Sequence, residues 1–265
     1  MSKIYAYSRR GFSKNKSKAK FGRRVRRKSG GARKSIVKIV KGIISRQAEN
    51  KAWFDYGVNQ SIATATTSTP TNKNLIPLPA QGTGHSQRVG NEIRVKSGYV
   101  KGHVNILPYD ATLNSNPLPV WVKIWILSCK SQNTTSLAST DIGNSLFDIV
   151  NSSVGLQGNM LDIDFTLNKE QWTCYGMKSF KLGVGAITSV GPVGTNSYYD
   201  NSPMSVPFYF NIGKHMKLIK FSDNTTPTNR NMFICFQVVP ANGVSGSNQI
   251  PAEFHYSTRI EYEDI

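Results

Sequence analysis

Cysteine is scarce in this chain, and long hydrophobic runs are absent. The three cysteines, Cys129, Cys174 and Cys235, are spaced neither as a disulfide framework nor as a CxxC zinc site, so we expect them to be reduced, buried and apolar in role. The most apolar stretch, residues 120–127, is interrupted by Lys123 and is far shorter than the roughly 18 residues that a membrane span needs. The first residues hold no apolar core of about 7 to 15 residues, so we expect no cleaved export signal and an intracellular protein.

Acidic residues are missing from the first 46 positions. The whole chain has 33 Lys and Arg against 15 Asp and Glu. Residues 1–46 hold 17 of the basic residues and none of the acidic ones, so 33 − 17 leaves 16 basic and 15 acidic residues for 47–265. The first segment is a polycation and the remainder is close to neutral. We predict a basic arm over 1–46 and a folded domain over 47–265.

The arm is predicted to bind nucleic acid. It has too little apolar surface to offset its ordering entropy, so alone it should be mostly disordered, and its like charges repel one another unless a polyanion neutralises them. Single-stranded nucleic acid suits a segment in which rings alternate with cations, because bases stack on rings while Lys and Arg contact phosphates. The predicted phosphate contacts are Arg9, Arg10, Lys14, Lys16, Lys18, Lys20, Arg23, Arg24, Arg26, Arg27, Lys28, Arg33 and Lys34. The predicted stacking rings are Tyr5, Tyr7, Phe12 and Phe21.

The end of the arm, residues 35–46, has helical spacing. Its apolar residues at i, i+3, i+4, i+7 and i+8 are Ile36, Ile39, Val40, Ile43 and Ile44. Ser35 stands at the N-cap position, so the pattern predicts a short basic amphipathic helix. Gly42 and the β-branched isoleucines weaken helix propensity, and a strand that docks on the domain is the alternative.

From Trp53 onward the hydrophobic period is two, which is typical of β-strands. The predicted strands are 53–59, 92–107, 120–130, 161–167, 180–184, 208–221, 232–239 and 254–262. A change of parity near Ser97 and Gly98 predicts a β-bulge, and the segment 120–130 is apolar on both faces, as in an interior strand. Within this part of the chain, residues 145–150 alone have a locally helical pattern. Eight strands joined by long polar loops predict an all-β domain, a single eight-stranded jelly roll of two packed antiparallel sheets or a related barrel.

A group of short motifs in a fixed order resembles a known family. Gln81-Gly82-Thr83-Gly84 is followed by Arg88-Val89-Gly90-Asn91-Glu92-Ile93 and then by a strand, with the basic arm before them and the strand 256–264 at the end. This order resembles the capsid proteins of small circular single-stranded DNA viruses, the circovirus-like group, over most of the chain.

The resemblance implies a viral coat protein built on a single jelly roll. It implies sixty identical subunits in a small icosahedral T=1 shell, with the arms facing inward onto single-stranded DNA. It also implies that the arm serves as a nuclear localisation signal, for which the best segment is Arg23, Arg24, Arg26, Arg27 and Lys28. The implied partners are a host import receptor and a cell-surface receptor, and the implied locations are the virion and, during assembly, the host nucleus.

The segment 81–90 has a structural interpretation that does not depend on the resemblance. Its glycines permit tight turns, and Arg88 can hold an adjacent loop before the next strand begins. The segment is not a phosphate-binding GxGxxG loop, because the spacing differs and no helix follows.

No catalytic motif is found in the sequence. The histidines show no HExxH spacing, and no GxSxG elbow or P-loop occurs, so we expect no enzyme, no cofactor and no metal. The four histidines, expected on the surface or in loops, are His85, His103, His215 and His255.

Two acidic groups invite a binding interpretation. Asp162 and Asp164 could take part in a calcium site between subunits, although a solvated polar face is the favoured explanation. Glu261, Glu263 and Asp264 are predicted to pair with a neighbouring subunit.

These observations together predict a non-enzymatic capsid protein whose Arg/Lys-rich arm packages single-stranded DNA. One alternative is a cellular basic nucleic-acid-binding protein with a β-sandwich body. Another is the jelly-roll capsid protein of a small RNA virus, because the arm cannot distinguish DNA from RNA. An enzyme with a basic targeting arm is the weakest candidate.

Overall fold

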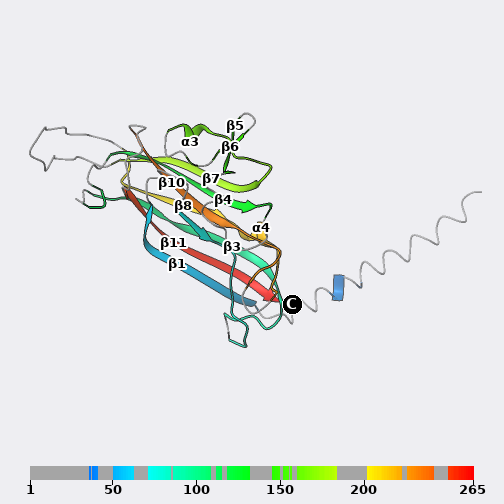
Figure 1. The fold of residues 1–265 in the computed structure, drawn as a ribbon. Coiled ribbons are helices and arrows are strands. Elements are labelled where there is room, and N and C mark those ends of the chain that lie inside the picture. Colours follow the sequence, from blue (N-terminus) through cyan, green and yellow to red (C-terminus); the bar gives the residue numbers. More distant parts are fainter. Residues whose placement is uncertain are drawn as a thin grey trace, which may run out of the picture. The chain divides into compact units, whose positions relative to one another are not determined.

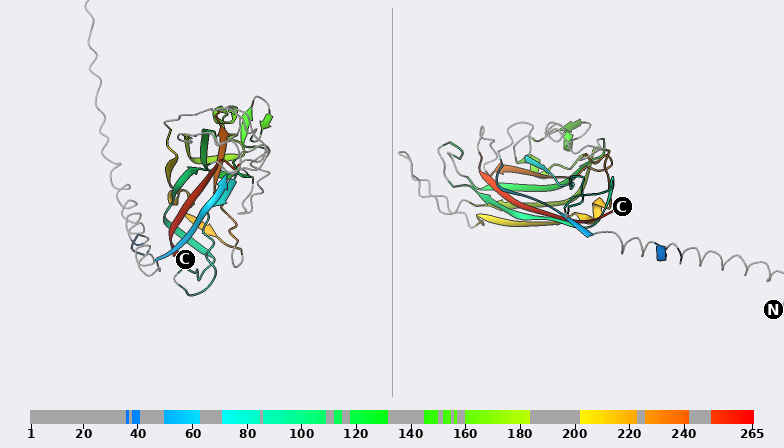
Figure 2. Two further views of the ribbon diagram at one scale, coloured as in Figure 1. Left: turned by 90° about the vertical axis from the view of Figure 1, so that its left-hand side faces the viewer. Right: turned by 90° about the horizontal axis from the view of Figure 1, so that it is seen from below.

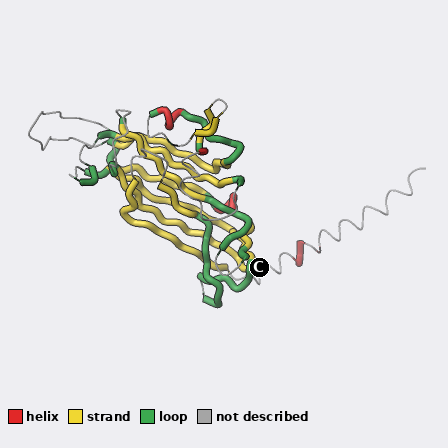
Figure 3. Tube along the Cα trace, viewed as in Figure 1, coloured by secondary structure: helices red, strands yellow, loops and turns green. Residues whose placement is uncertain are grey.

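Strands make up most of the folded part of the chain (Figure 1; Figure 3). The computed structural model describes residues 36, 38–40, 50–62, 71–84, 86–108, 112–114, 118–131, 145–149, 152–154, 156, 160–183, 202–222, 226–241 and 250–265. The strands are β1 (Asn50–Ile62), β2 (Thr71–Asn74), β3 (Glu92–Ile106), β4 (Val120–Cys129), β5 (Phe147–Ile149), β6 (Ser152–Val154), β7 (Trp172–Leu182), β8 (Ser205–Asn211), β9 (Leu218–Lys220), β10 (Phe233–Pro240) and β11 (Ala252–Asp264). Two helical turns interrupt this series, α3 (Leu161–Asp164) and α4 (Gly213–Met216).

The longer strands form two antiparallel sheets that pack face to face. The five-stranded sheet has the order β1-β11-β3-β8, with the short β9 also paired to β3, and the four-stranded sheet has the order β2-β10-β4-β7. Of the eight longer strands, each joins the sheet opposite to that of its predecessor, except that β4 and β7 are neighbours in one sheet. Figure 2 shows the two layers in its right-hand view. This is the double-sheet arrangement of a jelly roll, so the predicted eight-stranded jelly roll is confirmed.

Aromatic rings join the two sheets in the main core. Phe236 of β10 stacks on Phe254 of β11, with ring centroids 4.0 Å apart, and meets Phe208 of β8 edge-on at 5.7 Å. All three side chains are buried. Full burial of such a side chain contributes about 1.5–3 kcal/mol, so these contacts between strands far apart in sequence do much to hold the sheets together.

The outward face of the four-stranded sheet is covered as well. Trp125 and Leu127 of β4, with Phe233 and Cys235 of β10, pack against Phe147 of β5 in a second cluster of buried residues. The hairpin β5–β6 lies over this side of the sheet (Figure 2). This second cluster explains why β4 is apolar on both faces, and the predicted interior strand is confirmed.

One lysine is buried beneath this cover. Lys123 of β4 donates from Nζ to the carbonyl oxygens of Ile163 at 2.5 Å and Asp162 at 3.4 Å, both in α3. Burial lowers the pKa of Lys123, and the nearby Asp164 and Asp162 oppose that shift. The Asp162 carboxylate is also buried and accepts a hydrogen bond from Gln237 of β10 at 2.6 Å. The helical turn α3 thus covers the lysine, and two of its backbone carbonyls accept hydrogen bonds from the ammonium group.

Three predicted elements are wrong in detail. The strand expected at 161–167 is the turn α3, because Asp162 is drawn inward by Gln237 and the next strand pairs only from Trp172. The helical pattern at 145–150 contains the strand β5. The strand expected at 208–221 is divided by α4.

The break at α4 coincides with the predicted bulge. The pairing of β3 and β11 changes register between Glu261 and Tyr262, opposite the Ser97 region, so the bulge is confirmed. Gly213 of α4 lies directly against Gly98 of β3, where a Cβ on Gly213 would come within 2.4 Å of the Gly98 nitrogen. Only a glycine permits this close approach, and the strand therefore gives way to a turn at this point.

Candidate nucleic-acid interface

The predicted nucleic-acid contacts of the arm lie outside the described residues. This holds for all thirteen basic residues from Arg9 to Lys34, for the four aromatic rings and for the nuclear-import candidates. Their roles, and the division of the chain at residue 46, stay predictions. The described residues within 35–46 are Ile36, Lys38, Ile39 and Val40, all of which are helical and exposed. These four positions agree with the predicted helix.

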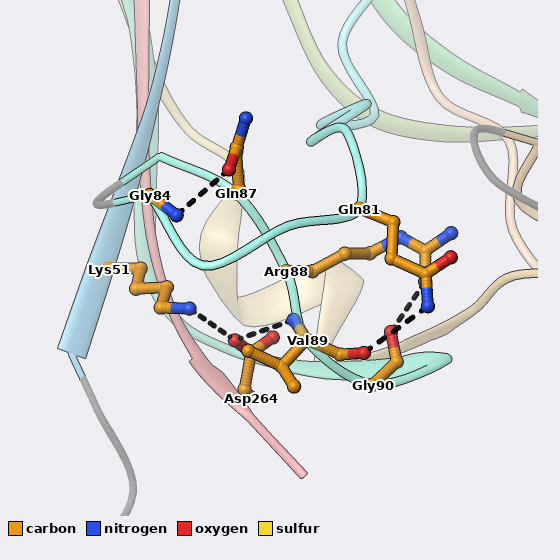
Figure 4. A network of polar contacts seen from close by, with 8 residues as sticks. All are labelled: Lys51, Gln81, Gly84, Gln87, Arg88, Val89, Gly90 and Asp264. Carbon is orange, nitrogen blue, oxygen red and sulfur yellow. Dashed lines mark hydrogen bonds and ion pairs between the residues drawn. The ribbon is translucent and has the colours of Figure 1, made fainter.

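The point at which the arm joins the domain is firmly anchored. Lys51, the second residue of β1, forms an ion pair with Asp264 of β11 at 2.7 Å, and both side chains are largely buried. The same carboxylate oxygen accepts a hydrogen bond from the Val89 amide at 3.1 Å (Figure 4). Lys96 of β3 donates to the Asn50 side chain at 2.7 Å. The first residues of β1 are therefore held to β3 and β11 by polar contacts of their side chains.

The segment 81–90 supports this anchor. Arg88 is fully buried, donates to the Gly90 carbonyl and to the Asn91 side chain, and lies over the Phe221 ring with its guanidinium carbon 4.3 Å from the ring centre. Its backbone exchanges hydrogen bonds with Ala80 and Gly82 across the loop. Figure 4 shows the guanidinium within the fold of this loop. The structural interpretation of Arg88 is confirmed.

The acidic residues at the end of β11 are paired within the chain. Glu261 contacts Arg259 at 2.9 Å and accepts from the Ser97 hydroxyl at 2.8 Å. Glu263 is buried and forms an ion pair with Lys96, and Asp264 pairs with Lys51 as described. These pairs hold β11 to β1 and β3, and the hypothesis that the cluster also pairs with a neighbouring subunit stays a prediction.

The outward face of the five-stranded sheet, unlike that of the four-stranded sheet, carries exposed aromatic rings. Phe54 and Tyr56 of β1 are 60% and 76% exposed, and Tyr209 of β8 is 53% exposed. The strand register places them in rows across the sheet. We call this surface the aromatic face and define it by Phe54, Tyr56, Tyr99, Lys101, Tyr209 and Arg259, which come from β1, β3, β8 and β11.

Each row of the aromatic face combines rings with a cation. In one row Phe54 lies opposite Arg259, which lies opposite Tyr99. In the next row Tyr56, Ser257, Lys101 and Tyr209 lie side by side. Directly opposed residues in antiparallel strands point to the same side of the sheet, so these side chains share one surface.

A groove of about 510 Å³ lies along this second row. Its lining includes Tyr56, Lys101, His103, Tyr209 and His255, and no Asp or Glu is among the twelve lining residues. The volume falls within the range of about 300–1,000 Å³ that is usual for ligand sites. The groove is therefore large enough for a flat ring system.

Sequence reasoning missed this surface. The alternation of Phe54, Tyr56 and Val58 resembles a buried face, yet these three residues point outward, and the opposite set faces the core. The reason is Tyr256 of β11, whose hydroxyl donates to Asp55 at 2.8 Å and whose ring lies where a Cβ on Gly57 would be, 2.3 Å from the ring carbon Cε1. The glycine at position 57 is the signal that could have revealed the inward side.

The remaining candidates do not form a reactive site. His103 and His255 lie opposite each other in β3 and β11, and His85 lies outside the described residues. His215 of α4 stacks on Tyr175 at 4.3 Å, where burial and then the charge of Lys214 lower its pKa. Within the described ranges, no group of three His, Cys, Asp or Glu residues could hold a metal ion.

Two further findings concern the cysteines and membranes. Cys129 and Cys235 are free and buried as expected, but Cys174 is free and exposed, because it lies on the edge strand β7 where no further strand pairs with it in the described part of the chain. Among the described residues, no helix has the length and apolar character to cross a membrane.

Comparisons with known proteins give weak likenesses. No protein-family model matches the chain, and no curated protein matches it. A chain from the structure of Desmodium yellow mottle tymovirus matches with a TM-score of 0.31 and 12% identity over 82% of this chain and 88% of that one. The mavirus penton protein matches with a TM-score of 0.21 and 6% identity over 82% of this chain and 100% of that one. Values this low assign neither family nor function.

Proposed function

We propose that this chain is a viral coat protein that self-assembles into a closed shell and packages single-stranded DNA through its basic arm. The observation that carries the proposal is the separation of charge, with 17 cations and no acid in residues 1–46 ahead of a nearly neutral jelly roll. A jelly roll by itself hosts many functions, so the arm and not the fold supports this role. The domain acts by contacts between subunits, without catalysis and without a cofactor.

The charge of the arm suits the packaging of a polyanion. In a shell of sixty subunits, 60 × 17 gives on the order of a thousand arm charges. These charges would bind the genome by releasing its counterions, a mechanism that requires no particular base sequence. The anchored start of β1 then ties the bound nucleic acid to the shell.

The finer features of the proposal rest on the resemblance to the circovirus-like group. They are a T=1 shell of sixty subunits, location in the virion, and import into the host nucleus through residues 23–28. Host import and cell-surface receptors are the further partners that this resemblance supports.

Negative-stain electron microscopy of the purified full-length protein tests the proposal, together with its absorbance at 260 and 280 nm. We expect closed particles of uniform size with an absorbance ratio that indicates nucleic acid. A monomeric or small soluble species that binds nucleic acid would instead favour a cellular nucleic-acid-binding protein. If the particles contain RNA, the shell is retained and the choice of DNA is wrong.

A further inference from the structure

We propose that the aromatic face is a second binding site for single-stranded nucleic acid, at which bases stack on exposed tyrosines while the arm holds phosphates. This inference rests on the proposed function, because it assigns a place on the domain to the same ligand. The ligand class is a single strand with unpaired bases, since only unpaired bases can offer a free face to a ring.

The first argument is the order of side chains across the sheet. In the row formed by Tyr56, Ser257, Lys101 and Tyr209, a cation lies between two exposed rings. Neighbouring strands are about 4.8 Å apart, so three spacings place β1 and β8 about 14 Å from each other. The order ring, cation, ring matches a base, a phosphate and a second base of one strand.

The second argument is charge. Lys101 is exposed, its Nζ lies 5.6 Å from the centre of the Tyr99 ring, and none of the described residues forms an ion pair with it. The nearby acids have partners of their own: Glu253 is within hydrogen-bond distance of His255 at 3.1 Å, and Glu261 forms an ion pair with Arg259 at 2.9 Å. Lys101 is the one Lys or Arg among the residues that line the groove, and no carboxylate is among them, so a phosphate in the groove would meet a cation and no lining acid.

The third argument is exposure. Tyr56 is 76% exposed, so its ring is little packed against the rest of the domain and its removal should disturb the fold little. A cluster of exposed rings on one sheet face is unusual for a surface that meets only water, whereas the equivalent face of the other sheet is covered by the β5–β6 hairpin. Aromatic rings among cations are the composition of surfaces that bind single strands without sequence preference.

The fourth argument is covalent continuity with the arm. Arg46, the last basic residue of the arm, lies ten positions before Tyr56, which is at most about 34 Å of extended chain. A nucleic-acid strand held by the arm would therefore be tethered to the domain that carries the aromatic face, and this tether raises its effective concentration so that the face needs only modest affinity of its own.

The test compares two probes that share phosphates and differ in bases. One is a fluorescent single-stranded oligothymidylate of about 20 nucleotides, and the other is an abasic oligonucleotide of equal length, both measured by anisotropy with the full-length protein at about 0.5 M salt to weaken the phosphate contacts. Stacking contributes about tenfold or more per base. We define base preference as the ratio of the affinity for the oligothymidylate to the affinity for the abasic probe. Because the arm has four rings of its own, the decisive quantity is the change in this ratio between the wild type and the variants.

We expect the double variant Tyr56→Ala, Tyr209→Ala to lose at least about tenfold of its preference for the oligothymidylate while its affinity for the abasic probe is unchanged. Tyr56→Phe, Tyr209→Phe keeps both rings and should keep the preference. Met177→Ala, which removes a 55% exposed side chain from β7 of the other sheet, is the matched control and should behave as wild type.

The outcomes separate this inference from the proposed function. An unchanged base preference in the double alanine variant overturns the aromatic face and leaves the arm and the shell intact. Failure of the wild type to bind either probe at a physiological salt of about 0.15 M contradicts the packaging proposal itself. Loss of particle assembly with unchanged base preference would make this face a subunit contact and also overturn the inference.

A second measurement needs no variant. Ultraviolet cross-linking of the wild type to a single strand that contains iododeoxyuridine, followed by peptide mass spectrometry, should label peptides of β1 and β8 in addition to the arm. Cross-links confined to residues 1–46 would overturn the inference.

Discussion

The ion pair between Lys51 and Asp264 offers a sharp test of how the start of β1 is held. Its Nζ and Oδ2 are 2.7 Å apart, with side chains 2% and 13% exposed. The pair between Lys220 and Glu92 also joins neighbouring strands at 2.7 Å, but its side chains are 50% and 39% exposed. The two ion pairs have the same distance between nitrogen and oxygen, but one is buried and the other is exposed. A comparison of them therefore isolates the effect of solvent on the strength of the pair.

We expect Asp264→Asn to lower the free energy of unfolding by about 3 kcal/mol, at the lower end of the usual cost of breaking a buried ion pair by changing one partner. The substituted side chain keeps an oxygen that can accept from the Val89 amide, so the loss reports the charge. Glu92→Gln removes the exposed pair and should cost no more than about 1 kcal/mol, because water screens both groups.

Urea unfolding followed by tryptophan fluorescence measures both variants on the same scale. With an m-value of about 3 kcal/mol/M, the Asp264→Asn midpoint should fall by about 1 M, and that of Glu92→Gln by a third of this or less. Equal shifts for the two variants would show that burial of Lys51 does not determine the strength of the anchor, and the reasoning would be refuted.

Three further predictions concern the core, the alkaline limit and the arm. Phe236→Ala should cost about 3–5 kcal/mol in urea unfolding, because it removes the ring between Phe208 and Phe254; a cost under about 1 kcal/mol would mean that the sheets do not depend on this stack. Tyr262→Phe should be nearly neutral at pH 7, since the hydroxyl is buried and has no hydrogen-bond partner among the described residues. Burial and then Asp264 raise the pKa of Tyr262 to about 12, above the unfolded value of 10.0, so the unfolded chain loses its proton first and stability falls as pH rises from 10 to 12; the variant should lose less over that window in pH-dependent urea unfolding. Deletion of residues 2–34 removes 14 cations, and it should leave the urea midpoint unchanged while reducing the slope of log affinity against log salt by up to about 10, whereas an unchanged slope would place the binding elsewhere.

The architecture could be predicted because the alternation along each strand is a local property. Strand 254–262 shows it clearly, with Phe254, Tyr256 and Tyr262 on the buried side of β11. The interior position of β4 could also be predicted from the sequence, since a strand with both faces covered must be apolar on both sides. The fold class and most of the strands follow from such patterns together with loop composition, whereas the short strand β2 was not predicted.

The errors arise where a distant contact outweighs the local pattern. Leu161–Asp164 alternates like a strand, but the buried pair of Asp162 and Gln237 and the lysine beneath it favour a helical turn. No feature within the segment reveals these partners, which lie on β10 and β4. The division of 208–221 by α4 depends in the same way on the bulge at Gly98, more than a hundred residues earlier.

The candidate site was predictable only in part. The charge of the arm is a matter of composition and is visible in the sequence. The aromatic face is not, because its rings come from strands that become neighbours only through the pairing of β1, β11, β3 and β8. The rings of β1 also point away from the core, since Tyr256 occupies the space beside Gly57.

The mass of the assembled particle tests the central claim most directly. Native mass spectrometry or analytical ultracentrifugation of the purified full-length protein after nuclease treatment should give a protein shell of 60 × 29.3 kDa, about 1.8 MDa, with protected single-stranded DNA inside. A species of one or a few subunits under the same conditions, with nucleic acid bound but open to nuclease, would contradict the coat-protein account.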